Sequence, residues 1–202
     1  MKQNKFIIGL TGGSGAGKGE VAKILSKLGA DIICADAVAH GIMKKDASPA
    51  FELIVAAFGK SVIGSDGEIC RKALREIVFY DKSKLTRLTS LLNPIITDAI
   101  LNTSSESKAK FVVIDAPLLI PSGLNAHCDV VIGVFAPKKL RIERICKRDG
   151  LSEAEALARL DNQMSDNELR PCVDFEINNE YTFEELSEIV GEVFADIADY
   201  QK

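Results

Sequence analysis

Seven consecutive residues near the start of the sequence have the composition of a phosphate-binding loop. They are Gly12, Gly13, Ser14, Gly15, Ala16, Gly17 and Lys18. The outer glycines and the lysine have the Gly-x-x-x-x-Gly-Lys spacing of the Walker A motif. Glycines allow backbone N–H groups to converge on phosphate oxygens, and the lysine supplies a positive charge for β- and γ-phosphates. This pattern predicts a nucleotide site in which Lys18 both binds ATP and assists phosphoryl transfer.

The segments that flank this loop are those that the motif needs. The apolar run Phe6–Leu10 before it is typical of a buried strand, and the stripe after it is typical of an amphipathic helix. That stripe consists of Val21, Ile24, Leu25 and Leu28. A helix that begins near Lys18 adds its positive end to the anion site. The alternative, a glycine-rich turn that binds nothing, does not account for this combination.

The residue after Lys18 departs from the motif. Most such loops place there a Ser or Thr whose hydroxyl binds Mg²⁺, whereas this chain has Gly19 followed by Glu20. We therefore expect Mg²⁺ to depend mainly on nucleotide phosphates and water. Asp115, at the end of another apolar run, is either a protein ligand of that Mg²⁺ or a partner for the turn into Pro117.

Apolar runs of strand length alternate with helical segments along the chain, which predicts an α/β fold in a single domain, 1–202. The runs lack a polar–apolar alternation, as in a parallel sheet flanked by helices. They are 6–10, 31–34, 111–114, 130–135 and 173–177. Ser152 with Glu155 and Thr182 with Glu185 have the spacing of capping boxes at helix starts.

Two stretches are longer than simple connections require. The stretch 37–110 predicts a helical acceptor-binding insertion with breaks at Pro49, Gly64–Gly67 and Pro94. The stretch 141–171, with its charged helices, predicts a second insertion, which is a lid if its arginines close on a bound nucleotide. Within it, Arg144 and Arg148 lie on one helix face, either to close on ATP phosphates or as part of a solvated charged helix.

Asp36 follows the second apolar run, and the carboxyl ends of strands are where ligands gather in open α/β sheets. A carboxylate there either accepts the proton of an acceptor hydroxyl or acts as a helix N-cap. Arg71 begins a helix in the predicted insertion. It contacts a phosphate of the acceptor substrate, or positions Asp36, or is a surface residue beside Lys72 and Arg75.

Composition narrows the class of protein further. The net charge of −4 gives no general basic surplus, so we expect no nucleic-acid partner. Five cysteines without a Cys-x-x-Cys pair favour a reducing compartment over zinc or disulfide frameworks. The N-terminal apolar run is too short to span a membrane. We expect a cytoplasmic protein with no membrane partner, and the oligomeric state stays open.

The order of motifs resembles the dephospho-CoA kinase family. The resemblance rests on residues 9–18, 66–74 and 78–79, on 92–96, 117–119 and 144–152, and on Asp36, Gln163, Asp174 and Asn179. It implies a P-loop kinase core with a helical substrate-binding insertion and a lid. It also implies transfer of the ATP γ-phosphoryl to the ribose 3′-hydroxyl of dephospho-CoA, with Mg²⁺ as cofactor and Asp36 as base. Arg71 and Arg148 would then lie in the site.

Four positions depart from the pattern of that family. They are Gly19, Cys34 in place of the first acid of an Asp-Ala-Asp motif, Asn93 in place of a histidine, and Pro121 in place of an acid. These changes leave two alternatives open beside dephospho-CoA kinase. One is another small-molecule or nucleoside monophosphate kinase, and the other is a nucleotide-binding regulator with impaired catalysis.

Overall fold

The computed structural model describes residues 5–180 and 182–200, without the Tyr200 side chain. Five strands form one sheet in the order β2-β3-β1-β4-β5. Their bounds are β1 Phe6–Gly12, β2 Asp31–Cys34, β3 Phe111–Asp115, β4 Val130–Phe135 and β5 Phe175–Asn178. The first apolar run therefore continues to Gly12, and the fifth strand begins two residues later than we expected. β1 pairs in parallel with β3 and β4, and β4 with β5, as predicted.

The chain divides into two compact units. The first consists of Met1–Ile33 and Ser107–Lys202, and the second of Cys34–Glu106. The insertion that we expected at 37–110 lies largely in the second unit. The segment that we expected as a lid, 141–171, lies in the first unit with the sheet. Among the described residues, no helix is long and apolar enough to cross a membrane.

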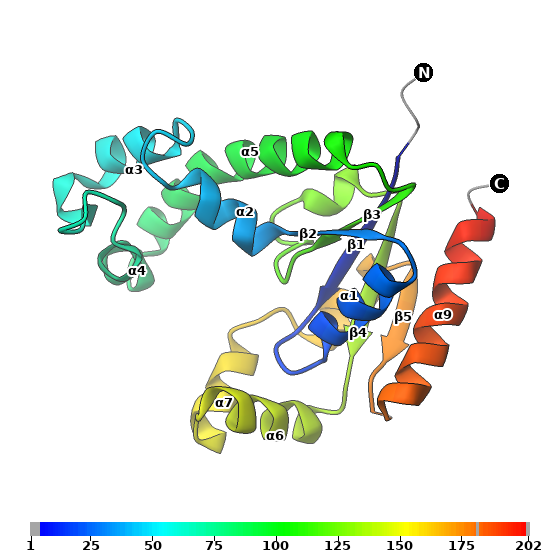
Figure 1. The fold of residues 1–202 in the computed structure, drawn as a ribbon. Coiled ribbons are helices and arrows are strands. Elements are labelled where there is room, and N and C mark those ends of the chain that lie inside the picture. Colours follow the sequence, from blue (N-terminus) through cyan, green and yellow to red (C-terminus); the bar gives the residue numbers. More distant parts are fainter. Residues whose placement is uncertain (1–4, 181, 201–202) are drawn as a thin grey trace. The chain divides into compact units, whose positions relative to one another are not determined.

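Helices α1 and α9 cover one face of the sheet in the first unit. α1 spans Lys18–Lys27 and α9 spans Phe183–Tyr200, beside β5 (Figure 1). Alternate residues of β1, Phe6, Ile8 and Leu10, belong to the same apolar cluster as the buried faces of both helices. On the other face, a Cβ at Gly9 would overlap Leu119, so the absence of a side chain at this position lets Leu119 pack against the strand. The strand before the phosphate loop is thus fixed from both sides.

The remaining elements of the first unit follow β3 and β4. They are η2 Leu124–His127, α6 Lys138–Asp149, α7 Glu153–Asp161, α8 Asp166–Leu169 and η3 Arg170–Cys172. The predicted capping box of Ser152 and Glu155 begins α7. Reciprocal hydrogen bonds of Thr182 and Glu185 confirm the second box, before α9. A third box, Ser165 with Glu168, begins α8 and was not predicted.

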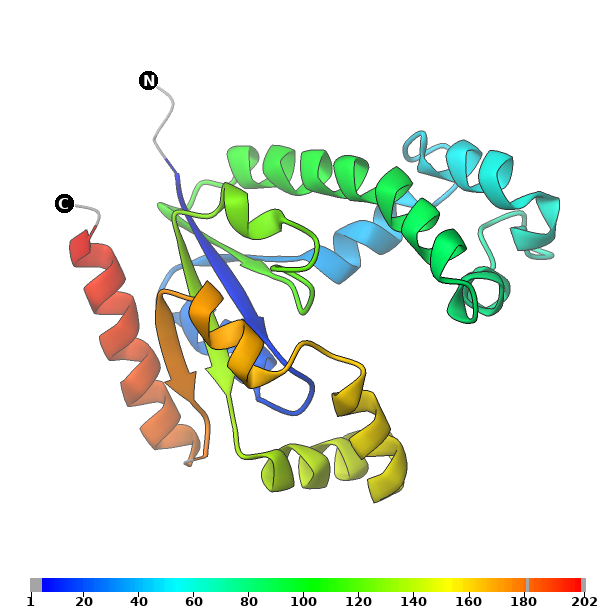
Figure 2. The same cartoon turned by 180° about the vertical axis from the view of Figure 1, so that it is seen from behind.

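The second unit is helical and has an apolar cluster of its own. Its elements are α2 Ala35–Ile42, α3 Ala50–Phe58, η1 Lys60–Val62, α4 Arg71–Phe79 and α5 Lys82–Glu106. Helix α5 contacts α2, α3 and α4 (Figure 2). Pro49 and Gly64–Gly67 lie at breaks between helices, as predicted.

The predicted break at Pro94 is wrong, because α5 continues through this residue. A proline inside a helix removes one backbone hydrogen bond and costs about 3 kcal/mol. Here the residues on both sides of the proline, Leu88, Leu92, Ile95 and Ala99, pack in the apolar cluster of the second unit. Tertiary burial before and after Pro94 therefore outweighs its local cost.

Candidate active site

The phosphate loop joins the end of β1 to the start of α1, the position that the sequence predicts. Gly15 and Gly17 have φ angles of 76° and 96°, which lie in the left-handed region. This region favours glycine because a Cβ collides there with the chain's own backbone. Gly17 is also the N-cap of α1, so that the first N–H groups of this helix open onto the loop.

Three successive carbonyl groups of the loop accept hydrogen bonds from side chains outside it. Arg141 Nε donates to the Ser14 carbonyl at 2.9 Å and Arg144 Nη1 to the Gly15 carbonyl at 3.3 Å. Asn179 Nδ2 donates to the Ala16 carbonyl at 2.9 Å. These carbonyl groups are therefore turned toward the protein. We call Arg141, Arg144 and Asn179 the carbonyl donors.

The direction of a carbonyl fixes the direction of the next N–H group, because the two are opposed across a trans peptide plane. The bonds to the Ser14 and Ala16 carbonyls thus set the N–H groups of Gly15 and Gly17. Within the part of the chain that the structure describes, neither N–H group has a protein acceptor. Unpaired N–H groups in a glycine loop at a helix N-terminus are typical of an anion site.

A cavity of about 720 Å³ opens at this loop and lies within the first unit. Among the described residues that line it, six are basic and one, Glu20, is acidic. The basic residues are Lys18, Lys23, Arg144, Lys147, Arg148 and Arg159. This local surplus contrasts with the net charge of −4 for the whole chain. The cavity therefore suits a polyanion such as a nucleoside triphosphate.

The residues predicted to bind the nucleotide lie at this cavity, with one exception. The predicted residues that line it are Gly12, Gly13, Ser14, Gly15, Gly17, Lys18, Gly19, Arg144 and Arg148. Ala16 does not. It is only 1% exposed, and its N–H donates to the Gly13 carbonyl. Its place in the loop is therefore structural.

Lys18 forms an ion pair with Asp115 at the end of β3. Both side chains are largely buried, at 15% and 14% exposure, so each compensates the charge of the other. The pair brings together the lysine and the carboxylate that the sequence placed in the same site. A phosphate group or a cation that enters here competes with this pair.

The charged residues of α6 and α7 form a second group of contacts at the cavity. Asp149 accepts hydrogen bonds from Arg148 at 2.7 Å and from Arg159 at 2.6 Å. The bond with Arg148 lowers the pKa of the Asp149 carboxyl and raises the pKa of the guanidinium. Asp149 and Arg148 are thus both charged at neutral pH. Asp149 holds two arginines that line the cavity.

Asp36 and Arg71 belong to the second unit, and both are exposed. Asp36 is the second residue of α2, whose N-cap is Cys34, so the alternative reading of Asp36 as an N-cap is wrong. Arg71 is the first residue of α4, as the sequence predicts.

A family model named for dephospho-CoA kinase matches residues 6–185 of this chain. The chain belongs to the dephospho-CoA kinase family. It is 38% identical over 191 residues to the dephospho-CoA kinase of Thermobifida fusca, covering 94% of this chain and 95% of that protein. Being a member of this family, it is an ATP-dependent kinase with a P-loop core.

Two solved structures have the same fold over nearly the whole chain. The crystal structure of TT1252 from Thermus thermophilus has a TM-score of 0.82 at 30% identity and covers 95% of this kinase and 97% of that chain. The dephospho-CoA kinase of Campylobacter jejuni has a TM-score of 0.61 at 29% identity, with 96% and 97% covered.

Three side chains that hold the loop have roles that the sequence did not predict. They are Arg141, Gln163 and Asn179, of which the last two appeared only as matches to the family pattern. Their partners lie 127 to 163 positions away in the sequence, so local spacing could not reveal them. A signal did exist for Arg141. It lies four residues before the buried Ile145, which places a cation on the apolar face of α6.

We predict that Gly17→Ala raises the Kd for ATP at least about 10-fold, measured by titration calorimetry. The added Cβ would overlap Asn179 Nδ2, which holds the Ala16 carbonyl, and would occupy a left-handed conformation. Gly29→Ala is the matched control, because Gly29 has a φ of 98° but no atom within 4 Å of an added Cβ. It should lower the melting temperature and leave the Kd unchanged. Equal Kd values for the two variants would contradict the prediction.

Proposed function

We propose that this kinase transfers the γ-phosphoryl group of ATP to the ribose 3′-hydroxyl of dephospho-CoA in the cytoplasm. The main support for this proposal is the anion site at the loop, where oriented N–H groups lie beside a cavity lined by basic residues. The chain also belongs to the dephospho-CoA kinase family. Five free cysteines are compatible with a reducing compartment. The net charge of −4 favours small-molecule substrates over nucleic acid.

On the donor side, the loop N–H groups and Lys18 would bind the ATP phosphates. The carbonyl donors keep the loop in one conformation before ATP binds, so that less reorganisation is needed in the reaction. Arg148 would stabilise the charge that spreads over the transferred phosphoryl oxygens. Arg144 already holds the Gly15 carbonyl, so we assign it to orienting the loop beside the phosphates.

On the acceptor side, Asp36 would accept the proton of the 3′-hydroxyl and orient this group for attack. A carboxylate of ordinary basicity is sufficient for this step, because the transition state of phosphoryl transfer is loose and the proton leaves late. Arg71 would contact a phosphate group of dephospho-CoA. Both assignments rest on the family motifs that these residues match and on their exposure in the second unit.

Mg²⁺ fits the donor set of this site when it arrives with the nucleotide. Mg²⁺ usually binds one or two carboxylates together with substrate phosphates and waters. Asp115 supplies a carboxylate beside Lys18, whereas Gly19 supplies no hydroxyl. The described residues contain no group of three or more potential metal ligands. When bound, Mg²⁺ would neutralise charge on the β- and γ-phosphates.

The first test is phosphorylation of dephospho-CoA by the purified protein with ATP and Mg²⁺. We expect product with the wild type and none above background with Lys18→Ala, because the variant lacks the charge that binds the β- and γ-phosphates. A circular dichroism melt establishes that the variant is folded. If the wild type binds ATP but forms no product, the proposed acceptor is wrong.

Asp36→Asn should lower kcat by about 100-fold or more, because an amide cannot accept the hydroxyl proton. The Kd for ATP should stay within about twofold, since the loop and its donors are unchanged. Steady-state rates and calorimetry measure the two quantities. Retention of full kcat would exclude Asp36 as the base.

Gly19→Ser should lower the Mg²⁺ concentration that gives half-maximal rate several-fold, by supplying the hydroxyl ligand that most P-loops have. No atom lies within 4 Å of a Cβ built at Gly19, so the side chain has room. Gly19→Ala is the control, because it adds the same Cβ without an oxygen. An equal shift in both variants would show that the hydroxyl is not the cause.

A further inference from the structure

Arg141 is a buried cation on α6 that the reaction scheme above does not use directly. It is 7% exposed, although it belongs to one of the most polar residue types. Burial of a guanidinium costs free energy unless its charge is paired and its N–H groups are hydrogen bonded. The contacts of this side chain therefore explain why an arginine is tolerated here.

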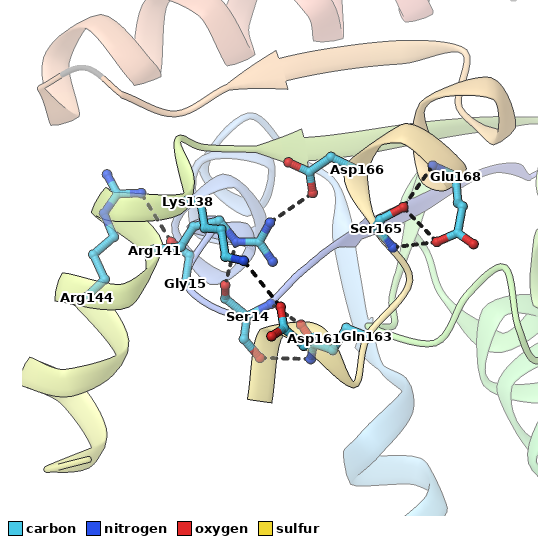
Figure 3. A network of polar contacts seen from close by, with 10 residues as sticks. All are labelled: Ser14, Gly15, Lys138, Arg141, Arg144, Asp161, Gln163, Ser165, Asp166 and Glu168. Atoms are coloured by element: carbon cyan, nitrogen blue, oxygen red, sulfur yellow. Dashed lines mark hydrogen bonds and ion pairs between the residues drawn. The ribbon is translucent and has the colours of Figure 1, made fainter. Parts of the chain in front are cut away.

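The guanidinium connects three segments of the first unit (Figure 3). Nη1 donates to Asp166 Oδ1 on α8 at 2.8 Å, and Nε donates to the Ser14 carbonyl at 2.9 Å. Nη2 lies so close to the Gly13 backbone that a Cβ at Gly13 would overlap it. The planar fork of an arginine makes these contacts at once, which the single ammonium group of a lysine cannot do.

Gln163 holds the same loop residue by its other groups. The Ser14 N–H donates to Gln163 Oε1 at 2.8 Å, and Gln163 Nε2 donates to Ser14 Oγ at 2.9 Å. Together with Arg141, this contact fixes the carbonyl, the amide and the hydroxyl of Ser14. The orientation of the Ser14–Gly15 peptide is thereby set, and with it the direction of the Gly15 N–H group.

The contribution of Arg141 is directional rather than a matter of net charge. Its positive charge is matched by the Asp166 carboxylate 2.8 Å away, so the pair adds little potential at the cavity. Arg141 is absent from the residues that line the 720 Å³ cavity, unlike Arg144 and Arg148 on the same helix. It acts on the anion site through the loop backbone.

We propose that Arg141, anchored by Asp166, is a positioning residue that turns the Ser14 carbonyl away from the anion site and so presents the Gly15 N–H to the nucleotide phosphates. The proposal rests on the proposed function only in that this loop binds phosphate. It makes no use of the acceptor substrate.

The test is calorimetric titration of Arg141→Gln with ATP and, as a probe of the loop alone, with inorganic tripolyphosphate. Loss of a charge-assisted hydrogen bond should raise both Kd values by about 10- to 100-fold. Arg141→Lys should recover only part of the affinity. Loss of folded protein lowers the binding stoichiometry and leaves the Kd of the folded fraction unchanged, so the two effects separate.

Two further variants change the partners of the Arg141 guanidinium and leave Arg141 itself in place. Asp166→Asn removes the anchor, and Gly13→Ala displaces Nη2 from the loop side. Each should raise the Kd for tripolyphosphate. Combining Asp166→Asn with Arg141→Gln should add little to the effect of Arg141→Gln alone, because the two residues act as one unit. Multiplicative effects in the double variant would overturn the anchoring role of Asp166.

The matched control is the ion pair of Lys138 and Asp161, whose Nζ–Oδ1 distance is 3.2 Å. It also starts on α6, but its side chains are 60% and 61% exposed, and among the described residues their polar bond is to each other and not to the loop. Lys138→Gln and Asp161→Asn should leave both Kd values within about twofold.

The outcomes distinguish this proposal from the proposed function. If the wild type does not bind tripolyphosphate, the loop is not a phosphate site and both proposals fail. If the wild type binds it and Arg141→Gln binds it equally well, only the role of Arg141 is excluded. If binding depends on Arg141 but dephospho-CoA is not phosphorylated, the positioning role holds and the proposed acceptor fails.

Discussion

The orientation of a few peptide groups in the phosphate loop is the constraint on which this site depends. N–H and C=O groups follow one another along the backbone. An anion site made of backbone N–H groups therefore requires the neighbouring carbonyl oxygens to point away from the anion. Here a donor outside the loop satisfies each of three successive carbonyls. The loop glycines follow from this arrangement. Gly13 leaves space for the Arg141 guanidinium, and an added Cβ at Gly15 would lie 2.6 Å from the Arg141 carbonyl oxygen.

The donors come from elements whose primary packing lies elsewhere. Arg141 and Arg144 are carried by α6, which buries Ile145 in a small apolar cluster with α7. Asn179 follows β5 and is 4% exposed, and its own backbone N–H donates to the Phe135 carbonyl at the end of β4. The sheet thus fixes one donor and a helix pair fixes the other two. The loop itself needs little rigidity of its own.

Much of the fold could be predicted from the sequence because its signals are local. The strand before the loop, the positions of the four other strands and two capping boxes depend on residues close in sequence. The prediction of a helix break at Pro94 failed because it rested on a local signal alone. Burial of α5 in the tertiary structure overrides the local cost of the proline. The length of the stretch 37–110 was enough to predict a helical insertion. The bounds of the second unit, Cys34–Glu106, and its own apolar cluster depend on long-range contacts, which local patterns do not show.

The site shows the same division between local and distant information. The Walker A spacing was enough to place Lys18 in a phosphate site. Nearly all residues of the predicted loop line the cavity. The ion pair of Lys18 with Asp115 joins residues 97 positions apart. It agrees with the expectation that both lie in one site, but no spacing rule could state that they touch. The hydrogen bonds that Arg141, Gln163 and Asn179 form with the loop could be found only in the structure, because each depends on the path of the whole chain between the two partners.

The long sequence separation of the carbonyl donors has a consequence for the order of events during synthesis. The glycine loop leaves the ribosome before Asn179, which holds its Ala16 carbonyl and emerges 163 residues later. Contacts of such separation form late, because a long segment of chain must first be ordered between them. A nascent chain that ends before β5 has the complete motif but lacks the hydrogen bond that orients its last peptide. The fully oriented loop is therefore formed only after β5 and Asn179 have been made, rather than when the motif itself is made.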